Sequence, residues 1–279
     1  MFVRVGLLIC VLAWATGLYG DVVHYYVGRD NRQTIPSGTY AGQPNPNYNR
    51  LSFLFGEEHV PVSQSHFHAV GIYSLTGPAG SPTTLDTSTA NVIPETSSGE
   101  EPLPLTAGGG LYAGTLRSKL GPSKYSNYEL RSVNSLYGEP SGTVGYYMLH
   151  SGGTTPTDRW AQSLAGSTIG LELVSLTPGL HVGTEADLDV LLNPGDQVTL
   201  GPGASLSFTP VFWVDDSVAP DSAYSAQFKL VDEQGVYLDS GRFTFNFTAV
   251  PEPGGFALAL SGFAGAALLL KRRFLTSAG

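Results

Sequence analysis

The chain has 279 residues and a formal net charge of −9 at pH 7, from 14 basic and 23 acidic residues. Charged residues make up only 13% of it and hydrophobic residues 42%, which is enough to bury a core and excludes wholesale disorder. Because acids are in excess and no basic run occurs outside the last ten residues, no nucleic-acid partner is expected.

The first twenty residues have the pattern of a secretory signal peptide. Arg4 precedes an apolar run from Val5 to Trp14, and small residues follow before polar Asp21. The run is about half the ~20 apolar residues that a membrane-spanning helix needs. Cys10, the single cysteine, lies inside the run, so cleavage would leave a body without a thiol or a disulfide. We therefore predict a signal peptide over residues 1–20 and export of the rest.

The body begins with a β-rich region that we place over residues 21–165. Alternating and apolar stretches predict strands at residues 22–27, 50–55, 66–75 and 143–149. One helix is expected over residues 126–138, because Ser126 and Glu129 have capping-box spacing and apolar residues follow on one face.

The second half of the body has the pattern of an antiparallel sandwich over residues 166–249. Apolar and polar residues alternate along 224–230 and 243–248, as in half-buried strands. Further strands are predicted at residues 168–176, 187–192, 196–200 and 205–214, separated by Pro, Gly and Asp turns. The expected fold class is therefore all-β with minor α, built from two antiparallel β domains, the second an immunoglobulin-like β-sandwich.

A His-x-His motif is the sharpest chemical signal of the body. Residues two apart on a strand project from the same face, so His66 and His68 can meet at one ion while Phe67 points to the other face. Without a thiolate, imidazole with a carboxylate or water is the remaining transition-metal site. Histidines also alternate on exposed strands without a metal, so the spacing alone leaves both interpretations open. Further candidate ligands are His24, His59, His150, Glu57, Glu58 and Glu95.

The C-terminal end combines a short motif, an apolar segment and a basic triplet. An apolar helix over residues 254–270 would reach roughly 22 to 25 Å, just under the ~30 Å hydrocarbon core of a bilayer. The basic triplet predicts a cytoplasmic C-terminus, in agreement with an exported body. The residues outside the apolar segment that carry the pattern are Val250, Pro251, Glu252, Pro253, Lys271, Arg272 and Arg273.

Residues 250–273 resemble the PEP-CTERM sorting segment of exported proteins from Gram-negative bacteria. The resemblance implies recognition and cleavage by exosortase, a membrane protease. It also implies transient anchoring in the cytoplasmic membrane and release to the cell surface or into an extracellular polysaccharide matrix. A permanent C-terminal anchor would have the same topology and stays an alternative.

The body is similar to a family of PEP-CTERM proteins under the control of the zinc-uptake regulator. The similar stretches are residues 24–28, 37–42, 45–51, 66–68, 71–74, 93–95 and 173–180. The resemblance implies production when zinc is scarce, and hence zinc binding outside the cell. It places the ligand role on His66 and His68, and also on His24 and His150. A zinc-independent substitute for another protein would be regulated in the same way.

Enzyme signatures are weaker than the binding motif. A cupin-like oxygenase also carries His-x-His on a strand, but residues 69–80 lack the acid that its pattern wants a few residues later. Nucleophilic hydrolysis lacks both a Gly-x-Ser-x-Gly elbow and a thiol. We expect no enzyme, but an exported zinc-binding protein that scavenges or buffers the metal. The alternatives are a structural or adhesive matrix protein without a metal and a cupin-like metal-dependent enzyme.

Overall fold

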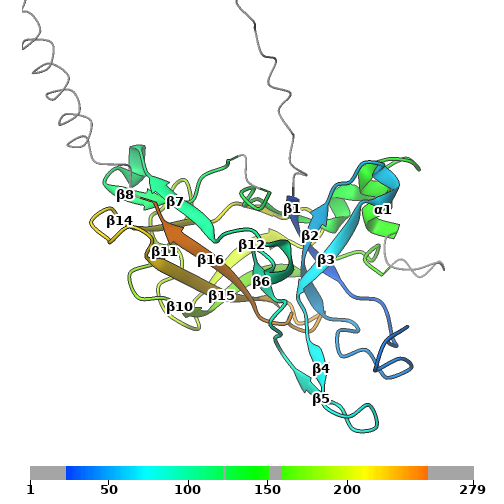
Figure 1. The fold of residues 1–279 in the computed structure, drawn as a ribbon. Coiled ribbons are helices and arrows are strands. Elements are labelled where there is room, and N and C mark those ends of the chain that lie inside the picture. Colours follow the sequence, from blue (N-terminus) through cyan, green and yellow to red (C-terminus); the bar gives the residue numbers. More distant parts are fainter. Residues whose placement is uncertain (1–22, 122–123, 151–158, 251–279) are drawn as a thin grey trace, which may run out of the picture.

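Three β-sheets and one α-helix make up the part of the chain that the computed structural model describes, residues 23–121, 124–150 and 159–250 (Figure 1). The expectation of a mostly β fold is confirmed. Within these residues no helix has the length and apolar character that crossing a bilayer requires. The predicted signal peptide and the predicted apolar segment 254–270 lie outside the described residues.

The first sheet has five strands in the order β13-β9-β1-β2-β3. All seven residues of β2 are buried, because the sheet is covered on both faces. The sheet joins segments from distant parts of the chain, since β13 pairs with β9. The strands are β1 (Val23–Arg29), β2 (Leu51–Glu57), β3 (His66–Gly71), β9 (Leu130–Ser132) and β13 (Ser207–Phe208).

The second sheet has nine strands in the order β11-β14-β8-β7-β16-β15-β10-β12, with β6 also beside β16. Burial alternates strictly along β16, as the sequence pattern predicts. The strands are β6 (Val92–Ile93), β7 (Leu103–Ala107), β8 (Thr115–Arg117), β10 (Thr168–Leu176), β11 (His181–Gly183), β12 (Gln197–Pro202), β14 (Val211–Asp215), β15 (Ala223–Asp232) and β16 (Phe243–Ala249).

A separate hairpin and short helical turns complete the fold. The hairpin of β4 (Ser74–Thr76) and β5 (Thr83–Leu85) projects from the end of β3, at the bottom of Figure 1. The α-helix is α1 (Val144–His150), and the 3-10 helices are Val62–Gln64, Thr96–Ser98, Gly110–Tyr112 and Val133–Leu136.

One aromatic core joins the first and second sheets. The rings of Phe53 and Phe243, from different sheets, stack with their centroids 4.0 Å apart, and Tyr25 meets Phe245 edge to face at 5.6 Å. Buried residues from both sheets form one continuous cluster. Burial of this shared surface is the main force that holds the sheets together.

Sheet pairing does not follow the predicted boundary between residues 165 and 166. From before it, β7 pairs with β16 and β8 pairs with β14, and from after it, β13 pairs with β9. The pairs of β1 with β9, β16 with β6 and β16 with β7 are parallel, so the expectation of antiparallel domains is wrong for these three pairs. The immunoglobulin-like sandwich over residues 166–249 stays a prediction.

The helix predicted over residues 126–138 is wrong. Instead, Leu130–Ser132 form β9, which pairs in parallel with β1, and the chain continues as the 3-10 helix Val133–Leu136. The hydroxyl of Ser132 accepts a hydrogen bond from the N–H of Asn134 at 3.1 Å and starts that short helix. Pairing with β1 outweighs the local helix signal, because it buries Leu130 beside Tyr25.

The α-helix lies where the sequence pattern predicts a strand, over residues 143–149. Thr143 accepts a hydrogen bond on its hydroxyl from the N–H of Tyr146 at 3.3 Å, which starts α1. The helix then buries Met148 and Leu149 against the first sheet. A short apolar run is compatible with a strand and with a buried helix. Here the helical form is the one that packs Met148 and Leu149 on the first sheet.

Two predicted strands of the second half are also corrected. Residues 187–192 form no regular strand, and only Leu191 makes an isolated bridge, to Val182. Residues 205–214 form two strands instead of one, because β13 lies in the first sheet and β14 in the second. The chain passes between the sheets at Pro210, which has no N–H for a continuous ladder.

Candidate metal centre

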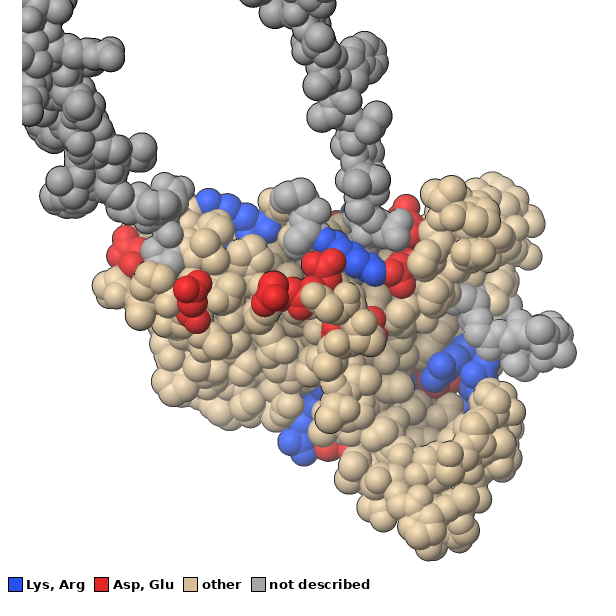
Figure 2. All heavy atoms as spheres, viewed as in Figure 1, with Lys and Arg blue, Asp and Glu red and all other residues tan. Residues whose placement is uncertain are grey.

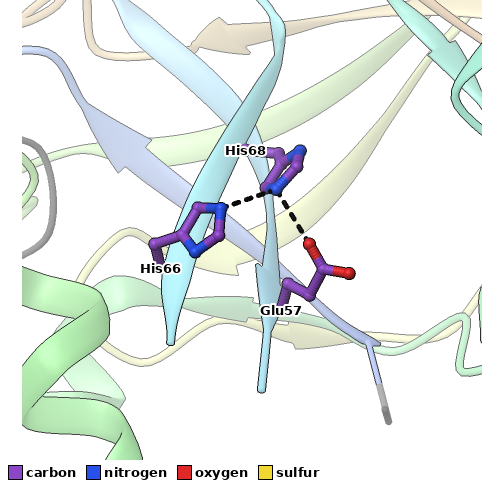
Figure 3. Close-up of side chains that lie close together, drawn as sticks. All are labelled: Glu57, His66 and His68. Atoms are coloured by element: carbon purple, nitrogen blue, oxygen red, sulfur yellow. Dashed lines mark hydrogen bonds and ion pairs between the residues drawn. The ribbon is translucent and has the colours of Figure 1, made fainter. Parts of the chain in front are cut away.

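The pairing of β2 with β3 brings three ligand-type side chains to one face of the first sheet. Glu57 lies opposite His66, and Phe55 lies opposite His68. Residues opposite each other, and residues two apart on a strand, share a face. Glu57, His66 and His68 therefore point toward one another at the end of the β2–β3 pair (Figure 3). We call these three residues the trio.

The trio has the spacing of metal ligands. The Nε2 atom of His68 lies 2.9 Å from Nε2 of His66 and 3.0 Å from Oε2 of Glu57. One ligand atom from each residue lies within 4.8 Å of the others. Zinc bonds of ~2.0–2.1 Å in a tetrahedron place neighbouring ligand atoms ~3.3 Å apart. The observed distances are close to that edge, so the trio can supply three corners of a zinc site.

Hydrogen bonds on the far side of each ring fix which nitrogen faces the trio. Nδ1–H of His66 donates to the carbonyl of Gln64 at 2.7 Å, and Nδ1–H of His68 donates to the carboxylate of Glu95 at 3.0 Å. This leaves the Nε2 lone pairs of both rings aimed at the space beside Oε2 of Glu57. Three acceptors then face one another, an arrangement that a shared cation stabilises.

Charges around the trio favour a proton or a metal ion there. Burial would lower the pKa of His68, but the hydrogen bond and charge of Glu95, and then the charge of Glu57, outweigh it and raise that pKa. Burial would raise the pKa of Glu57, but its contact with Lys124 outweighs burial and lowers it. Lys124 contacts Oε1 of Glu57, so Oε2 stays directed at the histidines.

Aromatic rings hold His68 in place. Phe55 stacks on the imidazole of His68 with centroids 4.5 Å apart, and Tyr125 meets Phe55 edge to face at 5.5 Å. Packing of this kind restricts the rotamers of a ligand before the metal arrives. The ring of His68 is therefore oriented by packing on one side and by Glu95 on another.

His59 stands beside the trio and is the candidate for a fourth ligand. Its ring lies parallel to that of His66, with centroids 5.2 Å apart. Its Nε2 atom is buried without a hydrogen-bond partner and lies 3.5 Å from Oε2 of Glu57. A buried nitrogen without a partner is costly unless something else binds it.

His24 and His150, which the resemblance marks as ligands, lie away from the trio. His24 pairs with Gly56, one position from Glu57, so its side chain projects from the opposite face of the sheet. There Asn127 donates a hydrogen bond to its Nδ1 at 2.8 Å. His150 is exposed at the end of α1, which packs on the same face as His24, because a Cβ on Gly56 would meet Met148.

Of the remaining candidate ligands, His59 and Glu95 contact the trio. In the sequence, only their residue type marks Glu57, His59 and Glu95 as candidate ligands. Glu58 instead lies 3.6 Å from His24. Sequence reasoning missed Lys124, for which the sequence carries no local signal.

Of the predicted sorting residues, the structure describes Val250. Its backbone N–H donates to the carbonyl of Leu105 at 2.9 Å. The predicted sorting residues outside the described part are Pro251, Glu252, Pro253, Lys271, Arg272 and Arg273.

Comparisons with known proteins give no relative for this chain. No protein-family model matches it, and neither a curated protein nor a solved structure matches it.

Proposed function

We propose that the protein binds one zinc ion at Glu57, His66 and His68, with His59 as the fourth ligand, and scavenges or buffers zinc outside the cell. The observation that carries the proposal is the convergence of two Nε2 lone pairs and one carboxylate oxygen within 4.8 Å. Imidazole nitrogens and a carboxylate oxygen are ligands that zinc binds in proteins, as several other divalent metals also do.

The surroundings of the site favour binding over catalysis. A catalytic zinc keeps one position open for water, whereas a storage or structural zinc has four protein ligands. His59 supports this choice, since its Nε2 is buried without a hydrogen-bond partner and lies 3.5 Å from Oε2 of Glu57, although it stands outside the group of three within 4.8 Å. The proposal is therefore a zinc-binding protein and not an enzyme.

Export is the second part of the proposal. Residues 1–20 direct the chain across the cytoplasmic membrane, and residues 250–273 hold it there until an exosortase-type protease releases it to the surface or the polysaccharide matrix. Mass spectrometry of the mature protein tests this part. We expect residues 254–279 to be absent from cells with an intact exosortase, and their retention there would contradict it.

Equilibrium dialysis of the purified full chain in detergent tests the zinc site. After chelator treatment, the protein should take up one zinc ion per chain at micromolar zinc. The variant His66→Ala/His68→Ala should bind at least ~100-fold more weakly, since it loses two ligands. The matched control His24→Ala/His150→Ala should bind like the parent. Absence of bound zinc in the parent, or equal binding by both double variants, would overturn the proposal.

A further inference from the structure

A second concave site lies at the other end of β3 from the trio. It is a cavity of about 300 Å³ between the loop that precedes β2 and the residues that lead into the β4–β5 hairpin. Its polar lining includes Arg32, Ser37, Tyr40, Tyr73 and Arg159. Figure 2 shows Lys or Arg atoms at the rim of a hollow above the lobe that carries the hairpin.

A buried carboxylate behind the lining holds Arg159 in place at this cavity. Asp30 is fully buried, and its Oδ2 accepts hydrogen bonds from Nε and Nη2 of Arg159 at 2.9 and 2.6 Å and from Asn45 at 3.1 Å. Its Oδ1 accepts the backbone N–H of Arg32 at 2.9 Å. A buried ion pair is stable only when its polar atoms are hydrogen-bonded in this way. The two bonds to Asp30 also hold the guanidinium of Arg159 in one orientation.

Two guanidinium groups line the cavity together. Burial, and next the charge of Arg159, lower the pKa of Arg32, and the charge of Asp30 partly opposes them. Among the described lining residues there is no acid, although the whole chain carries a net charge of −9. An anion beside both arginines would relieve their repulsion, and a planar carboxylate matches the guanidinium fork.

The rest of the lining suits a hydroxylated ring. Tyr40 donates its hydroxyl hydrogen to the carbonyl of Gly77 at 2.9 Å, which leaves its oxygen as an acceptor. The amide of Asn47 makes two hydrogen bonds to the backbone of Tyr73, at 2.7 and 2.9 Å, and fixes that wall. A cavity of this size is at the small end of ligand pockets, which are roughly 300–1,000 Å³. An inorganic anion alone would leave the tyrosine and aliphatic walls uncovered.

We propose that this cavity binds a carboxylate-bearing sugar, a hexuronate unit, with its carboxylate at Arg32 and Arg159 and its ring between Tyr40 and Tyr73. The protein would then bind a second class of ligand, at a site separate from the trio. This proposal does not depend on zinc binding. The hexuronate is a free monosaccharide or the end of an anionic polysaccharide, and both present the same chemistry to the cavity.

Calorimetric titration of the full chain with glucuronate and galacturonate, and with their oligomers, tests the proposal. We expect binding of a uronate but not of glucose, and a loss of at least ~10-fold in Arg32→Gln. Arg32→Gln leaves the bonds between Arg159 and Asp30 in place. Arg159→Lys is the second variant. Arg117→Gln is the matched control, because Arg117 lies in β8 of the second sheet and pairs with Glu185.

The outcomes separate the ligand sources and the two proposals. Oligomers that bind ~10-fold tighter than monomers would identify a polysaccharide end, and equal binding would identify the free sugar. His66→Ala/His68→Ala should keep uronate binding even where zinc binding is lost. The proposal is overturned if no uronate binds, if glucose or inorganic sulfate binds as tightly, or if neither arginine variant weakens binding.

Discussion

Glu95 orients His68 of the trio without being one of the proposed zinc ligands. Its carboxylate accepts Nδ1–H of His68 at 3.0 Å and thereby fixes both the ring and the nitrogen that faces Glu57. We predict that Glu95→Gln lowers zinc affinity by ~10–100-fold, the usual effect of losing such a partner. Competition with a zinc-binding dye measures the change. Glu101→Gln, an exposed acid on the same loop, is the control, and equal affinities in the two variants would contradict the prediction.

His59 gives a graded test of the proposed ligand set. The Nε2 atom of His59 lies 3.5 Å from Oε2 of Glu57. His66, by contrast, is one of the three residues whose ligand atoms all lie within 4.8 Å of one another. We predict that His59→Ala weakens zinc binding less than His66→Ala but more than His150→Ala. Dialysis of the three variants at the same zinc concentration gives the order. If His59→Ala bound zinc like His150→Ala, then water and not His59 would be the fourth ligand.

His24 makes the folded state sensitive to acid. Burial lowers its pKa below the ordinary 6.5, and the charge of Glu58 only partly offsets this. A histidine with a depressed pKa contributes stability above its unfolded pKa, and this is lost as pH falls through the folded pKa. We predict that His24→Gln loses less stability than the parent between pH 7 and about pH 5. Urea unfolding at both pH values measures this, and an equal loss would count against a depressed pKa.

At the residue scale the sequence predicts the His-x-His pair but not its partners. Strand alternation alone places His66 and His68 on one face. The register of β2 with its neighbouring strands decides that Glu57, and not Glu58 or His24, lies beside His66 and His68. This register depends on residues far apart in the chain, so local sequence patterns do not reveal it. Lys124 reaches the site from 67 positions away along the chain.

Gly71 shows how closely the sheets approach at the end of β3. A Cβ atom there would lie 2.7 Å from Cβ of Phe53 and 2.9 Å from the ring of Phe243. We predict that Gly71→Ala lowers the free energy of unfolding by about 1–3 kcal/mol, as overpacking of a core does. Denaturant unfolding measures it. Gly80→Ala, with no atom within 4 Å of the added Cβ, is the control and should be nearly neutral.

At the element scale, strongly alternating strands are predicted well and short mixed segments are not. The prediction of residues 168–176 coincides with β10, because alternation and flanking turns agree there. The capping-box pattern at Ser126 fails because β9 gains more by pairing with β1 than a short helix would gain locally. The exchange of a strand for α1 has the same cause, since local propensity is weak beside tertiary packing.

At the scale of the whole molecule, one core crosses the predicted boundary. Buried residues from before residue 165 and after it belong to one cluster, and two sheets contain strands from both sides. We therefore expect calorimetry to show a single unfolding transition, with the calorimetric enthalpy equal to the van't Hoff enthalpy. Two separate transitions would instead support the two domains that the sequence pattern predicts.

The metal content of the protein purified from its own cells, without added metal or chelator, is the decisive test of zinc binding at the trio. Inductively coupled plasma mass spectrometry gives the metals per chain, and the parent should carry close to one zinc ion. The variant His66→Ala/His68→Ala, purified in the same way, should carry almost none. A parent protein that is folded but holds no zinc, or holds a different metal in its place, would show that zinc is not the ligand of the trio.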